Sequence, residues 1–343
     1  MTAPDLGFAI VGTGVAGHYH ATAIAQTAGA RLVAVCRADA ARAGECAAQF
    51  GAPCEPNLAT LLARPDVDVV CIATPSGLHA QQALAAARAR KHLLVEKPLA
   101  LTLADADALI AECCHSAVLL GVMLQRRTDP TFQAVRAGIE QGALGRLVSG
   151  LISIPYLRPQ SYYDSAPWRG TWALDGGGVL MNQGIHLLDL LLWFMGDAVD
   201  VCARADTLAH AIEVEDCLAA TLRFASGALG TITATTAAAP GFPHRVEVYG
   251  TGGGVQIEGE HVTRWESASN QTASPVVTVP QQVDAGAGAS PTGISAIGHT
   301  RLVSDMVSAV REGREPLVSG AEARRSLALA LAVYAAARRA SDR

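Results

Sequence analysis

The chain has 343 residues, of which 50% are hydrophobic and 17% are charged, so it is long enough for two domains and too apolar for a disordered protein. Its formal net charge of −5, its pI near 6.1 and the absence of any run of Lys or Arg argue against a nucleic-acid partner or an anionic membrane surface. A small-molecule partner is therefore expected.

The eight cysteines lie scattered in apolar segments without a Cys-x-x-Cys pair, which predicts reduced thiols and no metal site. The first residues lack the basic region of a signal peptide and run directly into a strand pattern. No apolar stretch reaches membrane-spanning length. We therefore expect a cytoplasmic protein without a membrane partner.

Residues 1–122 alternate between short apolar runs and Ala-rich segments with helical spacing. The apolar runs are Phe8–Val11, Arg31–Cys36, Asp68–Ala73, His92–Val95 and Val118–Val122. Strands that alternate with helices pair in parallel and are covered by helices on both faces. The pattern predicts an α/β fold that begins with a doubly wound Rossmann domain.

Residues 123–343 change to a pattern of β character with turn signals between the runs. Helices are expected near Thr131–Gln141 and from Gly178 to Met195. The expected strands are Leu147–Ile154, Val199–Thr207, Cys217–Phe224, Leu229–Thr236, Arg245–Tyr249, Val255–Ile257 and Val276–Val279. This order predicts an α+β domain with an open, mainly antiparallel sheet. After a loop at Asp284–Gly298, two closing helices (299–312 and 320–339) follow, which can pack back on the first domain.

A Gly-x-Gly-x-x-Gly sequence lies between the first predicted strand and the first predicted helix, the context that dinucleotide binding requires. Gly12 permits the tight turn, Gly14 lets a pyrophosphate approach the backbone, and Gly17 lets helix and strand pack closely. The cofactor-binding residues predicted in this loop are Gly12, Thr13, Gly14, Val15 and Ala16.

The second strand ends where NAD-binding domains place an acid for the ribose 2′-hydroxyl, and here Arg37 occupies that place. Because a guanidinium attracts a 2′-phosphate, NADP(H) is favoured over NAD(H). Two alternatives remain open: Arg37 can stack on adenine or lie in water, and Asp39 can still reach the ribose.

Two further turns follow predicted strands at the edge where a doubly wound sheet binds its ligand. Thr74 and Pro75 are expected to border the cofactor, with His79 either beside it or on a helix surface. Glu96 and Lys97 follow the next strand, and Pro98 keeps Lys97 extended. This placement directs the two charges toward the nicotinamide rather than into a solvated loop.

In the second domain, Asn182, His186 and Asp189 are spaced to share one side of an otherwise apolar helix. Such a polar stripe would be buried unless it lined a cavity, so we interpret it as functional. The preceding loop crowds aromatic and Arg side chains together, as a sugar pocket would, or packs on the sheet. Its candidate substrate-binding residues are Tyr163, Arg169 and Trp172. His299, which opens a late helix, is a weaker candidate.

The chain resembles the Gfo/Idh/MocA oxidoreductases, the family of glucose-fructose oxidoreductase and inositol 2-dehydrogenase. The resemblance covers nearly the whole chain and rests on several motifs together. These are the glycine loop with His20, Ala73-Thr74-Pro75, Glu96-Lys97-Pro98, Gln125-Arg126, Gly176–Asp189 and Gly313-Arg314-Glu315-Pro316. The stretch from Trp168 to His186 is most similar to the branch that holds UDP-N-acetylglucosaminuronate 3-dehydrogenases.

The resemblance implies an NAD(P)-dependent dehydrogenase acting on a sugar, polyol or sugar derivative. Lys97 would lie beside the nicotinamide ribose and the reacting hydroxyl, and His186 would be the catalytic acid/base. Asn182, where the family often has Asp, would bind substrate. Asp189 is a further substrate-site candidate, for which an orienting role toward His186 or support of the helix is favoured over contact with substrate. The resemblance also implies a homodimer or homotetramer formed through the open face of the second sheet.

Two other functions are compatible with the same resemblance. Some relatives hydrolyse glycosides by transient oxidation with a retained nucleotide, which would release aglycone without free NADH. Others sense dinucleotide as non-catalytic regulators, an interpretation that Lys97 and His186 argue against, because both would be dispensable there.

Overall fold

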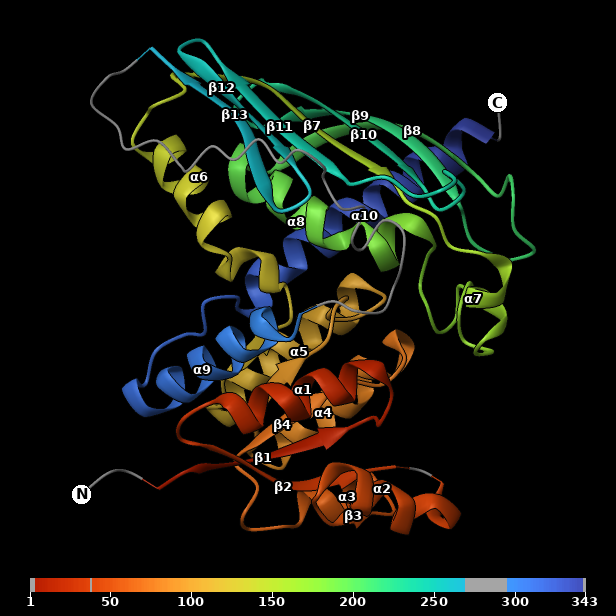
Figure 1. Cartoon of the computed structure of the whole chain (residues 1–343), viewed down its shortest axis with the longest axis vertical. Helices are drawn as coiled ribbons and strands as arrows, with labels where there is room; N and C mark the ends of the chain where they lie inside the picture. The colour runs from red at the N-terminus through yellow and green to blue at the C-terminus, as the bar shows by residue number, and fades with distance from the viewer. Residues whose placement is uncertain (1–3, 38, 269–294, 342–343) are drawn as a thin grey trace. The chain divides into compact units, whose positions relative to one another are not determined.

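The structure is a computed structural model that describes residues 4–37, 39–268 and 295–341. The chain divides into two compact units (Figure 1). The first unit is Met1–Thr128 with Ser295–Arg324, and the second is Asp129–Ile294 with Arg325–Arg343. Helix α10 (Gly320–Ser341) contributes residues to both units.

The first unit contains a six-stranded sheet in the order β3-β2-β1-β4-β5-β6, with every neighbouring pair parallel. Its strands are β1 (Leu6–Val11), β2 (Ala30–Cys36), β3 (Cys54–Glu55), β4 (Val69–Ile72), β5 (His92–Val95) and β6 (Leu120–Val122). The order reverses direction between β1 and β4, so the carboxyl ends of these strands open the ligand crevice typical of such sheets. The prediction of a doubly wound domain is confirmed.

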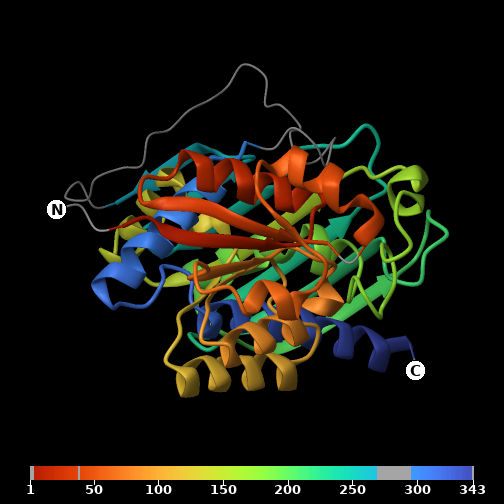
Figure 2. The same cartoon turned by 90° about the horizontal axis from the view of Figure 1, so that it is seen from below.

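Helices cover both faces of this sheet (Figure 2). They are α1 (Val15–Gln26), α2 (Ala43–Phe50), α3 (Leu58–Leu62), α4 (His79–Arg88), α5 (Leu103–Ser116) and α9 (Ile297–Glu312), with 3₁₀ turns η1 (Ala40–Arg42), η2 (Ser76–Leu78) and η3 (Gln125–Thr128). Helix α9 packs on α1, and α4 packs on α5. Helix α9, which begins at Ile297, thereby packs against the first helix of the chain.

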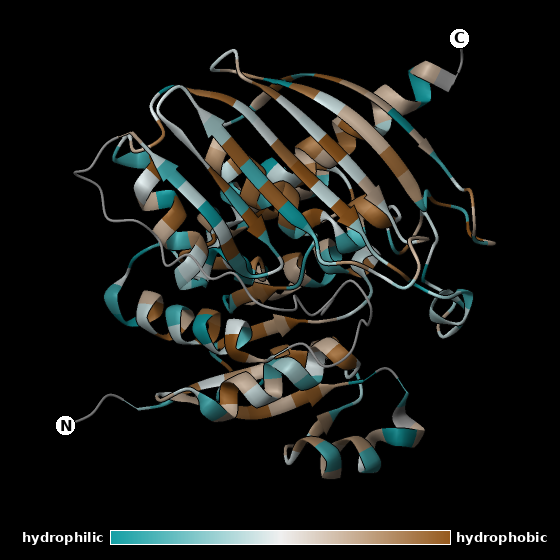
Figure 3. Ribbon diagram, turned by 45° about the horizontal axis from the view of Figure 1, so that its top comes forward, coloured by the Kyte–Doolittle hydropathy of each residue, from teal (hydrophilic) through white to brown (hydrophobic). Residues whose placement is uncertain are grey.

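The second unit contains a seven-stranded sheet in the order β13-β12-β11-β7-β10-β9-β8. The pair β7 and β10 is parallel, and the other described pairs are antiparallel. The strands are β7 (Leu147–Pro155), β8 (Ala198–Asp206), β9 (Cys217–Phe224), β10 (Leu229–Thr235), β11 (Arg245–Gly250), β12 (Gly253–Glu258) and β13 (His261–Ser267). In β9 and β10, buried and outward residues alternate, and the ribbon shows the alternation as bands of hydropathy (Figure 3). The predicted mainly antiparallel sheet is confirmed, and the expected strand Val276–Val279 lies outside the described residues.

The helices of the second unit are α6 (Pro130–Glu140), α7 (Gln160–Asp164), the π-helical turn η4 (Val179–Gln183), α8 (Ile185–Met195) and most of α10. The expectation of one helix from Gly178 to Met195 is wrong at its start, because a π turn precedes α8. As a result, Asn182 and His186 do not share one α-helical register. Among the residues that the structure describes, no helix combines the length and apolarity needed to cross a membrane.

Candidate active site

The glycine loop has the backbone shape that a dinucleotide needs. Gly12 has φ +103°, and a Cβ there would lie 2.5 Å from the carbonyl oxygen of Ala73. A Cβ on Gly17 would lie 2.3 Å from the carbonyl oxygen of Gly12, so helix α1 can approach β1 only with glycine there. A Cβ on Gly14 would meet no atom within 4 Å. The N-terminus of α1 therefore faces open space, which suits a pyrophosphate.

Arg37 leaves the end of β2 and turns toward this loop. Its Nη1 donates a hydrogen bond to Oγ1 of Thr13 at 3.1 Å. Its Nε is buried and has no hydrogen-bond partner among the described residues. Asp39, the alternative ribose ligand, instead accepts the N–H of Ala41 at 3.2 Å. The guanidinium thus lies beside the glycine loop, at the strand end where the adenosine ribose binds in such folds.

The turns after β4 and β5 are joined by His79, the first residue of α4. Its Nδ1 lies 2.7 Å from the carbonyl oxygen of Pro98, and its Nε2 lies 2.9 Å from that of Thr74. The ring is 1% exposed, and its burial lowers the pKa of His79 although both carbonyls favour the protonated ring. Of the two interpretations of His79, the helix-surface one is wrong, since the ring is buried between two loops.

Glu96 is buried between two histidines from distant parts of the first unit. Its Oε1 lies 3.1 Å from Nε2 of His20 on α1 and 3.2 Å from Nε2 of His299 on α9. Burial by itself raises the pKa of Glu96, but the two hydrogen bonds outweigh it and hold the pKa well below its usual range. Glu96 is thus a carboxylate with defined partners, directly before Lys97.

In the second unit, the residue predicted to bind substrate has a carboxylate partner that was not predicted. Nδ2 of Asn182 donates to Oδ1 of Asp175 at 2.6 Å, and the other carboxylate oxygen accepts the N–H of Gly170 at 2.9 Å. His186, four residues after Asn182 and in the first turn of α8, is half-buried. Asp189, in the same helix, is buried inside the unit. These positions favour a supporting role for Asp189 over contact with substrate.

The start of the π turn is held by Glu215, which precedes β9. Its carboxylate accepts the N–H groups of Gly178 (2.8 Å) and Leu180 (3.0 Å) and the hydroxyl of Tyr334 (2.9 Å). Burial raises the pKa of Glu215, although these donors oppose the shift. A Cβ on Gly178 would lie 1.7 Å from the carbonyl oxygen of Glu215, so only glycine fits there. Glu215 thereby supplies acceptors that the first N–H groups of a helical segment lack within the segment itself.

The aromatic loop forms a layered cluster rather than an array of separate side chains. The Arg169 guanidinium lies 4.2 Å from the ring centre of Tyr162 and 4.6 Å from that of Trp168. Trp172 is 38% exposed and packs edge-on against Tyr334 with a ring separation of 5.3 Å. Cation–π contacts of this kind hold a guanidinium in place while leaving its edge available for hydrogen bonds.

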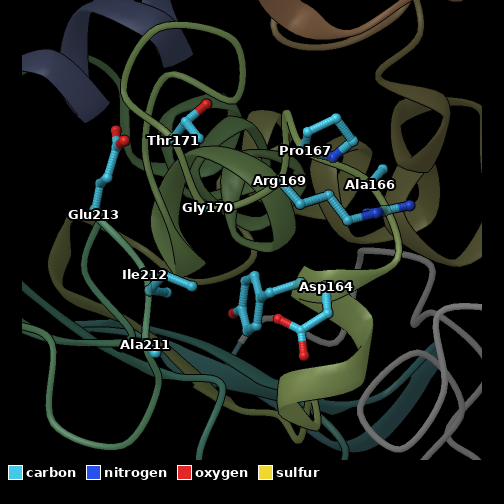
Figure 4. Close-up of a pocket in the computed structure, with 10 residues that line it drawn as sticks. Asp164, Ala166, Pro167, Arg169, Gly170, Thr171, Ala211, Ile212 and Glu213 are labelled. Carbon is cyan, nitrogen blue, oxygen red and sulfur yellow. The ribbon is translucent and has the colours of Figure 1, made fainter.

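A pocket of about 290 Å³ lies between residues 163–171 and 211–213 (Figure 4). In this view Ile212 lies on the side of the pocket opposite Asp164, whereas the Glu213 side chain points away from Asp164 and Arg169. Tyr163 also lines the pocket, but its hydroxyl lies 2.9 Å from Oγ1 of Thr236, and burial raises its pKa to about 12. The pocket therefore contains two of the predicted substrate residues. Its lining does not include the other three, Asn182, Trp172 and Asp189.

Sequence reasoning missed the buried acids that organise these segments. In the second unit these acids are Asp175 and Glu215. In the first unit, sequence reasoning also missed that His20 and His299 are the partners of Glu96. One available signal was the Glu215-Asp216 pair directly before an alternating strand, since charged residues are rarely buried without a partner. The partners themselves are remote in sequence and carry no local pattern.

A parallel sheet with a glycine loop at the N-terminus of its first helix, followed by a substrate-type α+β unit, defines a dinucleotide-dependent oxidoreductase. Two family models agree with this class. One, described as the oxidoreductase family with an NAD-binding Rossmann fold, matches residues 6–124. The other, the GFO/IDH/MocA C-terminal domain, matches residues 132–256. The chain belongs to the GFO/IDH/MocA oxidoreductase family.

Named relatives are dehydrogenases and reductases. Myo-inositol 2-dehydrogenase of Thermotoga maritima is 28% identical over 79% of this chain and 78% of the relative. The 1,5-anhydro-D-fructose reductase of Ensifer adhaerens is 32% identical over 81% of this chain and 79% of the relative. The WlbA dehydrogenase of Bordetella pertussis, solved with NADH and UDP-GlcNAcA, has a TM-score of 0.88 and 34% identity, covering 99% of this chain and 97% of the other. The protein is accordingly an NAD(P)-dependent oxidoreductase.

Proposed function

We propose that this protein is a dehydrogenase or reductase of a sugar, polyol or sugar derivative, with Lys97 and His186 acting on the reacting oxygen. The observation that carries the proposal is the placement of Glu96-Lys97-Pro98 at the carboxyl end of β5, beside the parallel strand β4. In doubly wound sheets this edge holds the reactive end of the dinucleotide. The relatives named above act on cyclic polyols and sugars, which supports the substrate class.

When bound, the nicotinamide supplies the acceptor or donor of hydride at its ring. In the oxidative direction His186 removes the proton of a secondary hydroxyl, and Lys97 donates a hydrogen bond to the same oxygen as negative charge develops on it. In the reductive direction His186 returns the proton. An imidazole suits both directions because its ordinary pKa lies near neutral pH.

NADP(H) is proposed as the preferred cofactor. The position of Arg37 supports it: its guanidinium is anchored on Thr13 of the glycine loop, where a 2′-phosphate would meet it. NADH was bound in the WlbA structure, so both cofactors belong in any assay.

A sugar that carries a carboxylate is the first substrate class to try. The stacked Arg169, and the buried Arg158 whose guanidinium lies 5.7 Å from the same Tyr162 ring, bring two guanidinium groups to the aromatic loop. Forked donors bind carboxylates in a bidentate manner. The WlbA complex with UDP-GlcNAcA adds to this choice.

The proposal is tested by a screen of inositols, sugars, sugar acids and UDP-GlcNAcA with NAD⁺ and NADP⁺, followed by the absorbance of the reduced nicotinamide. With the best substrate, Lys97→Ala and His186→Ala should each lower kcat at least about 10²-fold, the usual scale for a positioned proton-transfer group. Matched controls are Lys91→Arg, the only other lysine of the chain, and His261→Ala, an exposed histidine of β13. Both controls should retain normal turnover.

Near-normal kcat in Lys97→Ala or His186→Ala would overturn the assigned roles. Release of aglycone from glycosides without accumulation of reduced nicotinamide would instead identify the glycoside-hydrolysing reaction. Tight dinucleotide binding with no turnover of any class would favour the regulator.

A further inference from the structure

We infer that His20, His79 and His299 are positioning residues that hold the turn carrying Lys97 from both sides. The inference rests on the proposed role of Lys97 and deepens it. Each histidine contacts an immediate neighbour of the lysine in the chain: two contact Glu96 and one contacts Pro98. They come from three helices, α1, α9 and α4 (Figure 1).

The Glu96 side is held by paired donors to a single oxygen. Nε2 of His20 and Nε2 of His299 lie 3.1 Å and 3.2 Å from Oε1 of Glu96, and the two rings pack edge to face at 5.3 Å. Nδ1 of each ring is buried without a hydrogen-bond partner in the described part of the chain. A proton on Nδ1 would therefore be a buried, unsatisfied donor, so the proton of each ring belongs on Nε2, facing the carboxylate.

The Pro98 side is held by His79, which links two loops. Its two ring nitrogens lie against the carbonyl oxygens of Pro98 and Thr74, so the ring packs between the turns after β5 and β4. A neutral ring donates its one N–H to one of these carbonyls at a time. Pro98 lies beyond Val95, the last residue of β5 that pairs with β4, so its carbonyl is outside the ladder of these two strands. The contact that the structure gives this carbonyl is the ring of His79.

Lys97 thus lies between two residues whose positions are set by buried hydrogen bonds. A lysine side chain has four rotatable bonds, so a defined backbone anchor limits where its ammonium can be. Displacement of a catalytic group by about 1 Å can cost about 10²-fold in rate. The three histidines supply this anchor without contacting substrate.

The chain offers a direct readout, because Lys91 and Lys97 are its only two lysines. Nζ of Lys91 donates to the carbonyl oxygens of Arg64 (3.0 Å) and Val67 (2.9 Å), which provides an internal reference at the other end of β5. Protein labelled with ¹³C at lysine Cε gives two resonances, assigned with Lys91→Arg. Spectra of the full-length protein, with and without NADP⁺, report the environment of Lys97 independently of activity.

The test compares His299→Leu with His299→Gln, whose amide N–H can replace the Nε2 donor. His299→Leu should shift or broaden the Lys97 resonance, leave that of Lys91 unchanged, and lower kcat about 10-fold to 10²-fold with less than about 3-fold change in substrate KM. His299→Gln should recover most of both effects. His79→Leu serves as a second variant where His299→Leu does not fold, and His115→Leu, on the exposed side of α5, is the matched control.

An unchanged Lys97 resonance in folded His299→Leu and His79→Leu would overturn the inference, and so would equal shifts of both lysines. A stoichiometric divalent ion in the purified protein, lost in His299→Leu, would also overturn it, because His20, Glu96 and His299 would then be metal ligands. If the Lys97 resonance responds as expected while Lys97→Ala retains full turnover, the positioning is supported and the proposed function fails.

Discussion

Asn182 donates a hydrogen bond to the buried carboxylate of Asp175, and the two residues are seven positions apart in the chain. Asp175 is 2% exposed and also accepts the N–H of Gly170. An amide at position 182 can donate to this carboxylate, whereas an acid cannot while both are ionised. Asn182 stands where the family often has Asp, and in this chain the neighbouring Asp175 supplies a carboxylate to which Asn182 can donate.

Asn182→Asp should place two carboxylates within 2.6 Å, the present separation of the hydrogen-bonded atoms. Like charges at this distance disfavour joint ionisation and raise the pKa of one acid by several units. We expect the free energy of unfolding at pH 7 to fall by at least about 2 kcal/mol. Urea unfolding followed by tryptophan emission measures it, since all four tryptophans (168, 172, 193 and 265) lie in the second unit.

The exchanged pair Asp175→Asn/Asn182→Asp is the control for this prediction. It restores one amide and one carboxylate, so it should recover more than half of the lost stability. An exchanged pair no more stable than Asn182→Asp would show that the charge conflict is not the cause.

Asp216 predicts a pH dependence of stability. Burial opposes its ionisation, but the N–H groups of Leu208, Ala209 and His210 (2.8, 2.8 and 2.9 Å) and the ring of His210 (2.8 Å) together outweigh it, so the pKa of Asp216 lies below its ordinary value. For an acid with a lowered pKa, stabilisation is present above the unfolded pKa and is lost as the pH falls through the folded pKa. Asp216→Asn should cost about 2–3 kcal/mol at pH 7 and progressively less below about pH 4.

The measurement is urea unfolding of both proteins between pH 7 and pH 3. Asp200→Asn, on an exposed position of β8, should change stability by less than about 0.5 kcal/mol throughout. A pH-independent difference between wild type and Asp216→Asn would contradict the role of its charge.

Arg37→Gln should discriminate between the two cofactors. Loss of the guanidinium should weaken NADP⁺ binding at least about 10-fold, because a charge-assisted hydrogen bond to the 2′-phosphate is lost, and change NAD⁺ binding less than about 3-fold. Fluorescence titration with both nucleotides gives the two dissociation constants. Arg42→Gln, an exposed arginine paired with Glu45, should alter neither. Equal losses for the two nucleotides would reject the preference.

The eight cysteines should react with a thiol reagent at widely different rates. Cys114 and Cys202 are exposed, whereas burial raises the pKa of Cys36 to about 11 and that of Cys113 to about 12. Since the thiolate is the reactive form, native protein at pH 8 should show two fast thiols by DTNB absorbance. The double variant Cys114→Ser/Cys202→Ser should lose this fast phase. Four or more thiols reacting at one rate would contradict the described burial.

Local patterns were sufficient for most of the elements and for the glycine turn, although the strand β13 was not among the expected ones. The alternation of apolar runs with helical segments predicted the parallel sheet of the first unit, and the glycine spacing predicted the turn at Gly12, because both depend on residues close in the chain. The two-residue strand β3 was not predicted, since a run that short has no periodicity. The roles proposed for Lys97 and His186 stay predictions.

Other features depended on residues that are far apart. The segment expected to be one helix from Gly178 begins with a π turn, and its first N–H groups are accepted by Glu215, 37 residues after Gly178. No helical pattern contains that information. The sequence made His299 only a weak candidate for the functional site. In the structure its Nε2 lies 3.2 Å from the carboxylate of Glu96, 203 residues earlier in the chain. Hydrogen-bond partners of buried charges are chosen by the packing of whole elements, whereas backbone preferences and hydrophobic spacing act within a few residues. For that reason the motifs in the sequence were enough to predict the dinucleotide-binding fold. The acids and histidines that stabilise its turns could be identified only from the tertiary structure.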